Sequence, residues 1–388
     1  MRCQIRPAPR VSLEAFARMS VMSPSRSVCL SLFLCLATAF GLAQQSADPA
    51  IQPPSREPAL TPRPSGTPTP NAAEGRIHLD VVVNDKAGNP VSGLDLNDFT
   101  LLDNNQPSKI RSFHAVGGPD QKPGQVVQAI LVLDAANAAV TGVAREREEI
   151  DIFLRRDSGH LPLPISIFLF TDAGMKMVAQ PSMDGNALAA QLDQAEPGLR
   201  AITRATDSNG AIERLQLSLN ALTSLVTAES RKPGRKLLIW VGAGWPLLNG
   251  PNIQSSPKGY DEMFNAIVHL SGSLREARIA LYNVSLGLPG ARTFLYQDFL
   301  KGAKSARQVS LGDLSEKVFA IESGGRVLGP SNDLAGELAT CVRDAFPYYT
   351  LSFDPPRPEK PDEYHDLKVQ IGKPRLTART STGYYDQP

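Results

Sequence analysis

One carboxylate in this chain of 388 residues stands where a ligand site can form, at the end of a long apolar run. Asp134 closes the stretch AILVLD (129–134), and small residues follow it. A carboxylate in that place has two common uses. It supplies an oxygen ligand to a divalent cation, or it accepts hydrogen bonds from backbone N–H groups of the next loop. The residues that surround it decide between these roles.

Strands and helices must alternate around Asp134 to bring it to such an edge. Continuous apolar runs, typical of strands covered on both faces, recur along 125–345, and helical stripes such as Ile212, Leu215, Leu219, Leu222 and Val226 lie between them. This pattern predicts an α/β domain over 125–345 with a doubly wound, mostly parallel sheet and helices on both faces. The strand–turn–strand texture of 165–180 predicts one antiparallel hairpin at an edge.

The flanks of this domain have β texture instead. Residues 76–120 and 346–388 alternate apolar and polar side chains with the period of half-buried strands. Each flank is too small to close a core of its own. We therefore expect the N-terminal and C-terminal β segments to pair into one small β unit beside the α/β domain.

The first 75 residues have the layout of an export signal and a tether. Residues 1–27 are basic and 28–43 are apolar with small residues at the end, which favours a signal peptide over 1–43. The alternative is a membrane anchor, for which a run of 16 residues is short. The proline-rich segment 44–75 cannot bury enough surface to fold and predicts a disordered linker. The expected destination is the periplasm, the cell envelope or the medium, with no membrane span after signal removal.

Charge and cysteine content exclude several classes of protein. The formal net charge is +1 with scattered lysines and arginines, which gives no case for binding nucleic acid or a membrane surface. Without 1–43 the chain keeps one cysteine, Cys341, which has apolar neighbours at helical spacing and is expected to be buried and inert. The mixed-charge run REREEID (145–151) predicts a solvated helix face.

The apolar runs, taken in order, resemble a von Willebrand factor type A (VWFA) domain. They are AILVLDAANAAV, ISIFLFTD, RKLLIWVGAGWP and ARIALYNVSL. The flanks VVVNDKAGNPVSGLDLNDFTLLDNNQPSKIRSF and LTARTSTGYY are similar to the ends of the VWFA-related proteins typical of Acidobacteria. The resemblance covers roughly residues 77–385. It implies an exported protein that binds other proteins.

The same resemblance implies a place for a divalent metal, and most of its ligands are missing here. The family pattern begins Asp-x-Ser-x-Ser, and this chain has Asp134 followed by Ala136 and Ala138. The position of the later aspartate falls at Gly242–Gly244. Hard cations need several oxygen ligands, so we predict no metal and no cofactor, with Mg²⁺ at a degenerate site as the alternative. Asp134 is then expected to bind the backbone of its own loop.

Two further residues bear on that alternative. Thr206 is a candidate for a second oxygen ligand, with Thr203 and Ser208 as alternatives in the same loop. Asn137 adds an amide oxygen at a spacing that departs from the family pattern.

Recognition at this edge does not require a metal. Gly242, Gly244 and Trp245 follow an apolar strand and should lie beside Asp134. An exposed tryptophan is a good anchor for a protein interface, and core packing under a loop is the equal alternative for Trp245. With Asp134, Asn137 and Thr206, these residues form the predicted binding set.

Enzyme motifs are absent from the sequence. It has no Gly-x-Ser-x-Gly, no His-Glu-x-x-His and no phosphate loop, and its five histidines are widely spaced. We therefore predict a non-enzymatic protein whose partner is another protein of the envelope or exterior. Three alternatives stay open: a Mg²⁺-dependent adhesion protein, an unrecognised hydrolase, and binding by strand addition to the β segments.

Overall fold

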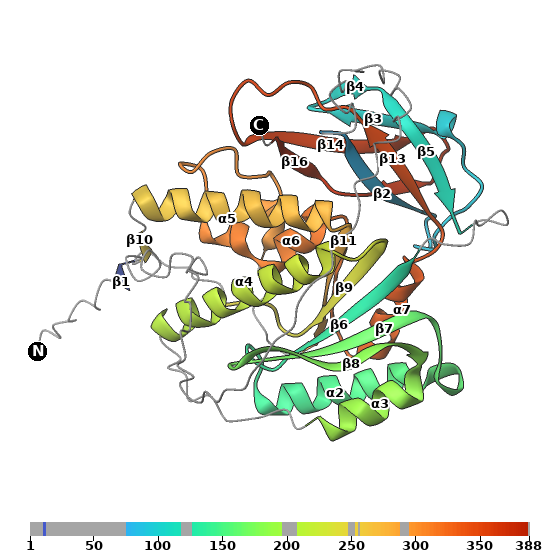
Figure 1. Cartoon of the computed structure of the whole chain (residues 1–388), viewed down its shortest axis with the longest axis vertical. Coiled ribbons are helices and arrows are strands. Elements are labelled where there is room, and N and C mark those ends of the chain that lie inside the picture. Colours follow the sequence, from blue (N-terminus) through green and yellow to red (C-terminus); the bar gives the residue numbers. More distant parts are fainter. Residues whose placement is uncertain are drawn as a thin grey trace, which may run out of the picture. The chain divides into compact units, whose positions relative to one another are not determined.

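The computed structural model describes residues 11–12, 75–117, 126–195, 208–246, 253–254, 257–287 and 295–386. The predicted signal peptide and linker lie outside these residues apart from β1 (Val11–Ser12), which pairs in parallel with β10 (Ile253–Gln254). The other elements form a six-stranded sheet with its helices and two four-stranded sheets (Figure 1).

The six-stranded sheet carries the predicted α/β core. Its order is β12-β11-β9-β6-β7-β8, and only β8 runs antiparallel, against its neighbour β7. Numbered along the chain within this sheet, the order is 3-2-1-4-5-6 read from β8, which is the doubly wound arrangement. The strands are β6 (Val127–Asp134), β7 (His160–Thr171), β8 (Gly174–Asp184), β9 (Arg235–Val241), β11 (Ile279–Leu286) and β12 (Val327–Ser331).

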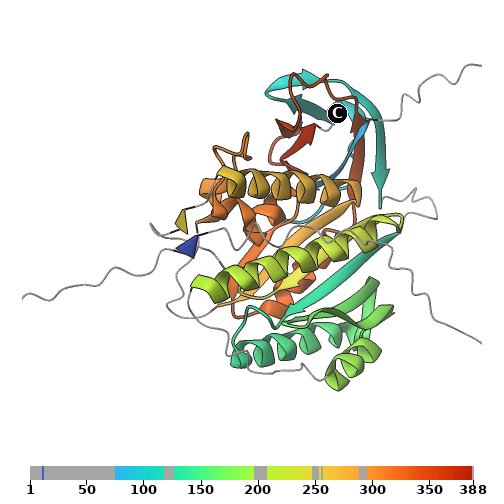
Figure 2. The same ribbon diagram turned by 60° about the vertical axis from the view of Figure 1, so that its left-hand side comes forward.

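Helices cover both faces of this sheet because its strands are apolar on both sides. On one face, three helices pack against the sheet around one apolar core: α2 (Val140–Leu154), α3 (Gly185–Gln194) and α7 (Leu334–Arg343). The other face carries α4 (Ser208–Ser230), α5 (Pro257–Glu276) and α6 (Glu316–Glu322). Figure 2 shows α4 and α5 side by side across their face, and the predicted leucine stripe of α4 is buried beneath them. Short 3₁₀ turns occupy Leu96–Asp98, Arg156–Gly159, Tyr296–Phe299 and Leu311–Leu314.

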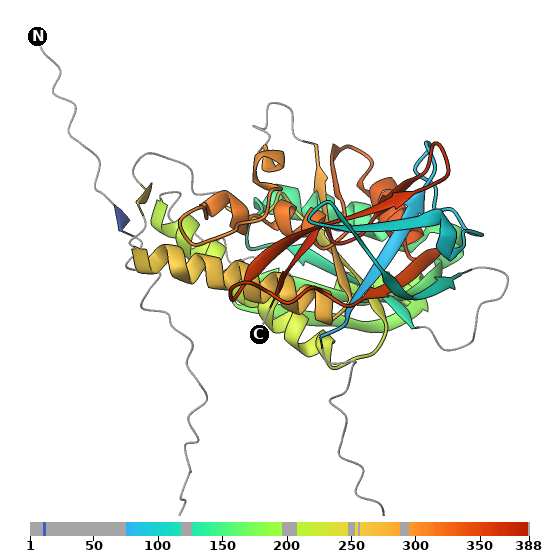
Figure 3. The same ribbon diagram turned by 90° about the horizontal axis from the view of Figure 1, so that it is seen from above.

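The two β flanks form a sandwich that mixes both ends of the chain (Figure 3). One sheet has the order β15-β2-β13-β5 and the other β16-β14-β3-β4. Side chains from both sheets share one apolar core, among them Leu79, Leu101, Phe353 and Leu367. The strands are β2 (Ile77–Asn84), β3 (Phe99–Asp103), β4 (Gln106–Ser108), β5 (Ile110–Val116), β13 (Tyr348–Phe353), β14 (Glu363–Ile371), β15 (Thr377–Arg379) and β16 (Gly383–Asp386). The predicted fold class is thus confirmed, including the β unit built from flanking strands.

Charged side chains tie the sandwich to the α/β core. Arg278, just before β11, makes two hydrogen bonds of 2.6 and 3.1 Å to the carboxylate of Asp80 on β2. Asp344, after α7, is 1% exposed and accepts from Arg326 and from Arg379 of β15. Separating a buried carboxylate from its two guanidinium partners costs several kcal/mol, so these contacts hold the sandwich against the α/β core.

We predict that deleting residues 346–388 abolishes cooperative unfolding of the remaining chain. The deletion removes β13 to β16 and strips the partners from Leu79 and Leu101. Six buried side chains are lost from the shared core: Tyr349, Leu351, Phe353, Leu367, Val369 and Tyr384. At about 2 kcal/mol each the loss is on the order of 10 kcal/mol, comparable to the stability of a whole domain. Urea unfolding followed by circular dichroism measures it. Removal of only 387–388 is the control, and full stability of the long truncation would contradict a shared core.

Candidate functional site

The carboxyl ends of β6 and β9 meet at the point where the strand order of the sheet reverses. β6 pairs with β7 on one side and β9 on the other. The next helix after β6, α2, packs on one face of the sheet, and the next helix after β9, α5, packs on the other. Ligands of open α/β sheets gather at this switch point. Asp134 is the last residue of β6, and Gly242 follows the last residue of β9.

Asp134 is fully buried there, with both carboxylate oxygens occupied by protein donors. Its Oδ1 accepts from the backbone N–H groups of Ala136 and Asn137, each at 3.0 Å. Its Oδ2 accepts from Nδ2 of Asn137 at 2.8 Å and from the indole Nε1 of Trp240 at 2.9 Å. Burial raises the pKa of Asp134, although all four donors favour the ionised form. The carboxylate therefore holds the loop 135–139 against β9.

The indole that binds Asp134 is part of an aromatic cluster. Trp240, on β9, is fully buried and lies edge-on to Phe170 and Trp245, with ring centroids 5.4 and 5.7 Å apart. Trp245 is 5% exposed and also contacts Phe319 of α6. Its surroundings are those of core packing under a loop, so the ring offers no exposed anchor to a partner.

Of the remaining candidates of the predicted binding set, Asn137 and Gly242 contact Asp134. Asn137 is half-buried and also donates to Oγ of Ser218 on α4 at 3.0 Å. A Cβ at Gly242 would come within 2.9 Å of the Asp134 Cβ, so only glycine lets the β9 loop approach. Gly244 is half-buried beside Lys317. Thr206 lies outside the described residues.

A divalent metal does not fit the donors at this edge. Ala136 and Ala138 carry no side-chain oxygen, Gly242 offers none either, and the carboxylate of Asp134 already accepts four hydrogen bonds. Within the described ranges, no group of three or more His, Cys, Asp or Glu side chains is placed to hold a metal ion. Binding an ion here would require breaking the bonds to Trp240 and Asn137.

Two more buried carboxyl groups flank Asp134, and the sequence reading missed both. Glu146 lies on α2 and is 4% exposed, so the predicted solvated face of 145–151 is wrong at this position. Burial, and then the nearby charge of Asp134, raise the pKa of Glu146 to about 8. Its spacing of three residues from Val143 and four from Ile150 was the available signal, because it places the side chain on the buried stripe of the helix.

Glu316 is the second of these groups and lies at the start of α6. It is fully buried, and its Oε1 accepts from Nδ2 of Asn283 on β11 at 3.0 Å. Burial is the main reason, and the charge of Asp134 the second, why its pKa is raised well above the ordinary value. Carboxyl groups in such surroundings favour the protonated state, which reduces the negative charge held beneath the edge.

The exposed surface at the switch point, over Asp134, Glu146 and Glu316, consists of small apolar side chains. Ala139 and Val140 start α2 beside the switch point, and Ala243 follows β9, all three exposed. The side chain of Val140 belongs to the few large apolar groups among the described residues that are strongly exposed, at 47%. Lys317 supplies a half-buried cation nearby. The edge therefore offers shape and apolar contact.

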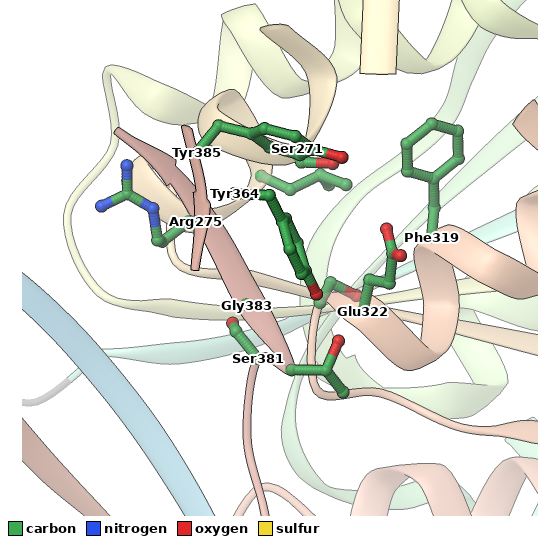
Figure 4. Close-up of a pocket in the computed structure, with 11 residues that line it drawn as sticks. Ser271, Arg275, Phe319, Glu322, Tyr364, Ser381, Gly383 and Tyr385 are labelled. Carbon is green, nitrogen blue, oxygen red and sulfur yellow. The ribbon is translucent and has the colours of Figure 1, made fainter. Parts of the chain in front are cut away.

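A small cavity between α5, α6 and the sandwich is another place where reactive groups converge. Figure 4 shows Ser271, Glu322 and Tyr385 turned toward one another, with Tyr364 and Arg275 beside them. Burial, and then Asp313, raise the pKa of Glu322 to about 8. The cavity has about 20 Å³, which holds one water molecule and no substrate. It offers a hydrolase nowhere to bind its substrate.

A helix that crosses a membrane needs a long, continuous apolar stretch. None of the described helices is long and apolar enough for this.

Comparisons with known proteins give matches at the level of structure alone. No family model matches the sequence, and no curated protein matches it. Among solved structures, human COPII-coat protein Sec24c matches at 11% identity and a TM-score of 0.34, over 70% of this chain and 45% of its own, so this chain spans less than half of it. Manganese-loaded TRAP of Plasmodium vivax matches at 11% identity and a TM-score of 0.31, over 69% and 96% of the two chains.

A VWA domain is also among these matches. The VWA domain of SpRpn10 is 11% identical with a TM-score of 0.28, and the match covers 56% of this chain and 94% of that one. Likenesses this low carry no argument about a ligand or partner, and the fold assigned above follows from the strand order itself.

Proposed function

We propose that this chain is an exported protein-binding module of the VWFA-related type, which recognises its partner at the carboxyl edge of the six-stranded sheet without a metal. The observation that carries the proposal is the hydrogen bonding of Asp134. All four of its donors belong to the protein, so the carboxylate is unavailable to a cation or to a partner.

The apolar surface above Asp134 supports this edge as the place of contact. Val140, Ala139 and Ala243 are exposed around the switch point, where loops of neighbouring strands come together. When a partner covers apolar side chains at such a place, the removal of their surface from water stabilises the complex. The support for export is the composition of residues 1–43, and for an extended tether that of 44–75.

We predict that Val140→Arg prevents partner binding and that Ile152→Arg does not. Both residues lie on α2 and are similarly exposed, at 47% and 46%, but Ile152 lies at the far end of the helix from the switch point. A buried, unpaired arginine at an interface costs several kcal/mol, so binding should weaken at least about 100-fold. Partners are captured from an envelope extract of the source cells, purified, and measured by calorimetry with each variant.

Each measurement is repeated in EDTA and in millimolar Mg²⁺. The proposal expects equal affinity in both. An affinity that EDTA removes supports the Mg²⁺-dependent adhesion protein instead, and equal loss with both arginine variants places the interface elsewhere.

A further inference from the structure

A second cavity lies at the opposite end of the sheet from the switch point. It opens where α2 ends, β7 begins and α7 ends, and the turn after β2 of the sandwich completes it. Its volume is about 500 Å³, within the range of sites for small organic ligands. Both parts of the fold contribute walls, so the cavity depends on the sandwich being in place.

The floor of this cavity is apolar and rigid. Phe153, Leu161, Leu163 and Val342 line it and are at most 5% exposed, and all four belong to the core of the α/β domain. The half-buried ring of Phe346 closes one side. Such a surface favours the hydrocarbon part of a ligand, because binding removes apolar area from water on both sides.

The rim of the cavity carries more positive than negative groups. Two guanidinium groups, of Arg156 and Arg343, line it against one carboxylate, Asp157, and the His160 ring lines it as well. Arg343 donates to Oγ1 of Thr340 at 2.8 Å and forms no salt bridge with any residue the structure describes. Arg156 is 3.6 Å from the exposed carboxylate of Asp333, a loose contact in water. Both guanidinium groups can therefore bind an anion at little cost.

We propose that this cavity binds a small amphiphile with an apolar body and one terminal carboxylate, which lies against the floor and meets Arg343 and Arg156 at the rim. A guanidinium group matches a carboxylate with two parallel hydrogen bonds, which a neutral or cationic end group cannot form. Nothing in this assignment involves the carboxyl edge, so it stands or fails independently of the proposed protein contact.

Calorimetry with decanoate tests the assignment on the purified protein, with decylammonium as the matched cation. We expect one molecule of decanoate to bind and decylammonium to bind at least about tenfold more weakly. Arg343→Gln should weaken decanoate about tenfold, whereas Arg155→Gln, a nearby arginine paired with Asp151 outside the cavity, should leave it unchanged.

A second variant fills the cavity without altering its charges. Ala339 lines the wall, and Ala339→Phe should abolish binding while thermal melting shows the protein folded. The assignment is overturned if decanoate does not bind at about 1 mM, if Ala339→Phe binds it as the original protein does, or if decylammonium binds equally well.

Discussion

Asp134→Ala is expected to lower the free energy of unfolding by about 3 kcal/mol. The substitution leaves four donors without their acceptor: the indole of Trp240, the amide of Asn137, and the backbone N–H groups of Ala136 and Asn137. Trp240 is fully buried, so no water replaces the lost oxygen at its Nε1. Each unsatisfied buried donor costs roughly 1–3 kcal/mol, partly offset because a costly buried carboxylate is removed. Urea unfolding at neutral pH measures the change.

Asp172→Ala is the matched control for this substitution. Asp172 follows the neighbouring strand β7 and is half-buried. Its replacement should change stability by less than about 0.5 kcal/mol. If Mg²⁺ raises the melting temperature of the original protein and Asp134→Ala removes that rise, the carboxylate binds a metal and the structural role is wrong.

The fold could be predicted from the sequence because the hydrophobic pattern of each segment and the need to bury its apolar side chains indicate the same structure. The apolar runs of β6 and β9 are too hydrophobic for any place except a covered sheet, and the alternation in β2 and β14 specifies strands with one buried face. Neither β flank could close a core alone, so their pairing followed from burial.

The state of the site could be read only in part, because it depends on pairs of residues far apart in the chain. The missing oxygens at Ala136 and Ala138 were visible in the sequence, and they argued against a metal. The partner of Asp134 was not visible, since Trp240 sits in the run KLLIWV and looks like one more apolar strand residue. Only the parallel register of β6 and β9 brings its indole to the carboxylate.

Buried polar groups on the helices and in the sandwich also depend on partners that the sequence alone does not reveal. Glu146 has the spacing of the buried stripe, but its charge and its neighbours made a solvated face the ordinary interpretation. His365, on the alternating strand β14, is buried with its Nδ1 2.8 Å from Oδ1 of Asp103. These residues are 262 positions apart, a pairing that the antiparallel register of β3 and β14 creates.

Glu146→Gln is expected to remove a large part of the loss of stability that a rise in pH from about 4.5 to about 8 causes. The pKa of Glu146 is about 8 in the folded protein, against 4.5 for an ordinary glutamate. Between these pH values the unfolded chain has lost the proton and the folded chain keeps it, so folding must take up a proton from solution. Stability is therefore full below pH 4.5 and falls as the pH rises toward 8. Above that pH the cost is constant, at up to about 5 kcal/mol.

Glutamine keeps the size of the protonated glutamate and cannot ionise. The variant should therefore become more stable than the original protein as the pH rises. The difference in unfolding free energy between the two, measured in urea at pH 4 and at pH 9, should grow by up to about 5 kcal/mol. Glu148→Gln, at an exposed position of the same helix, should show no such growth. The comparison isolates Glu146 from Glu322, whose pKa is also about 8 and whose contribution is common to all three proteins.

The charge of Asp134 links this prediction to the first one. It is the second cause of the raised pKa of Glu146, after burial. In an Asp134→Ala background, the gain from Glu146→Gln between pH 4 and pH 9 should therefore become smaller, because the neighbouring negative charge has gone. If Glu146→Gln gains the same stability between pH 4 and pH 9 in both backgrounds, the two carboxyl groups do not interact. If it gains none in either background, Glu146 is solvated. A reduced gain would identify Asp134 as an ionised carboxylate within a closed edge.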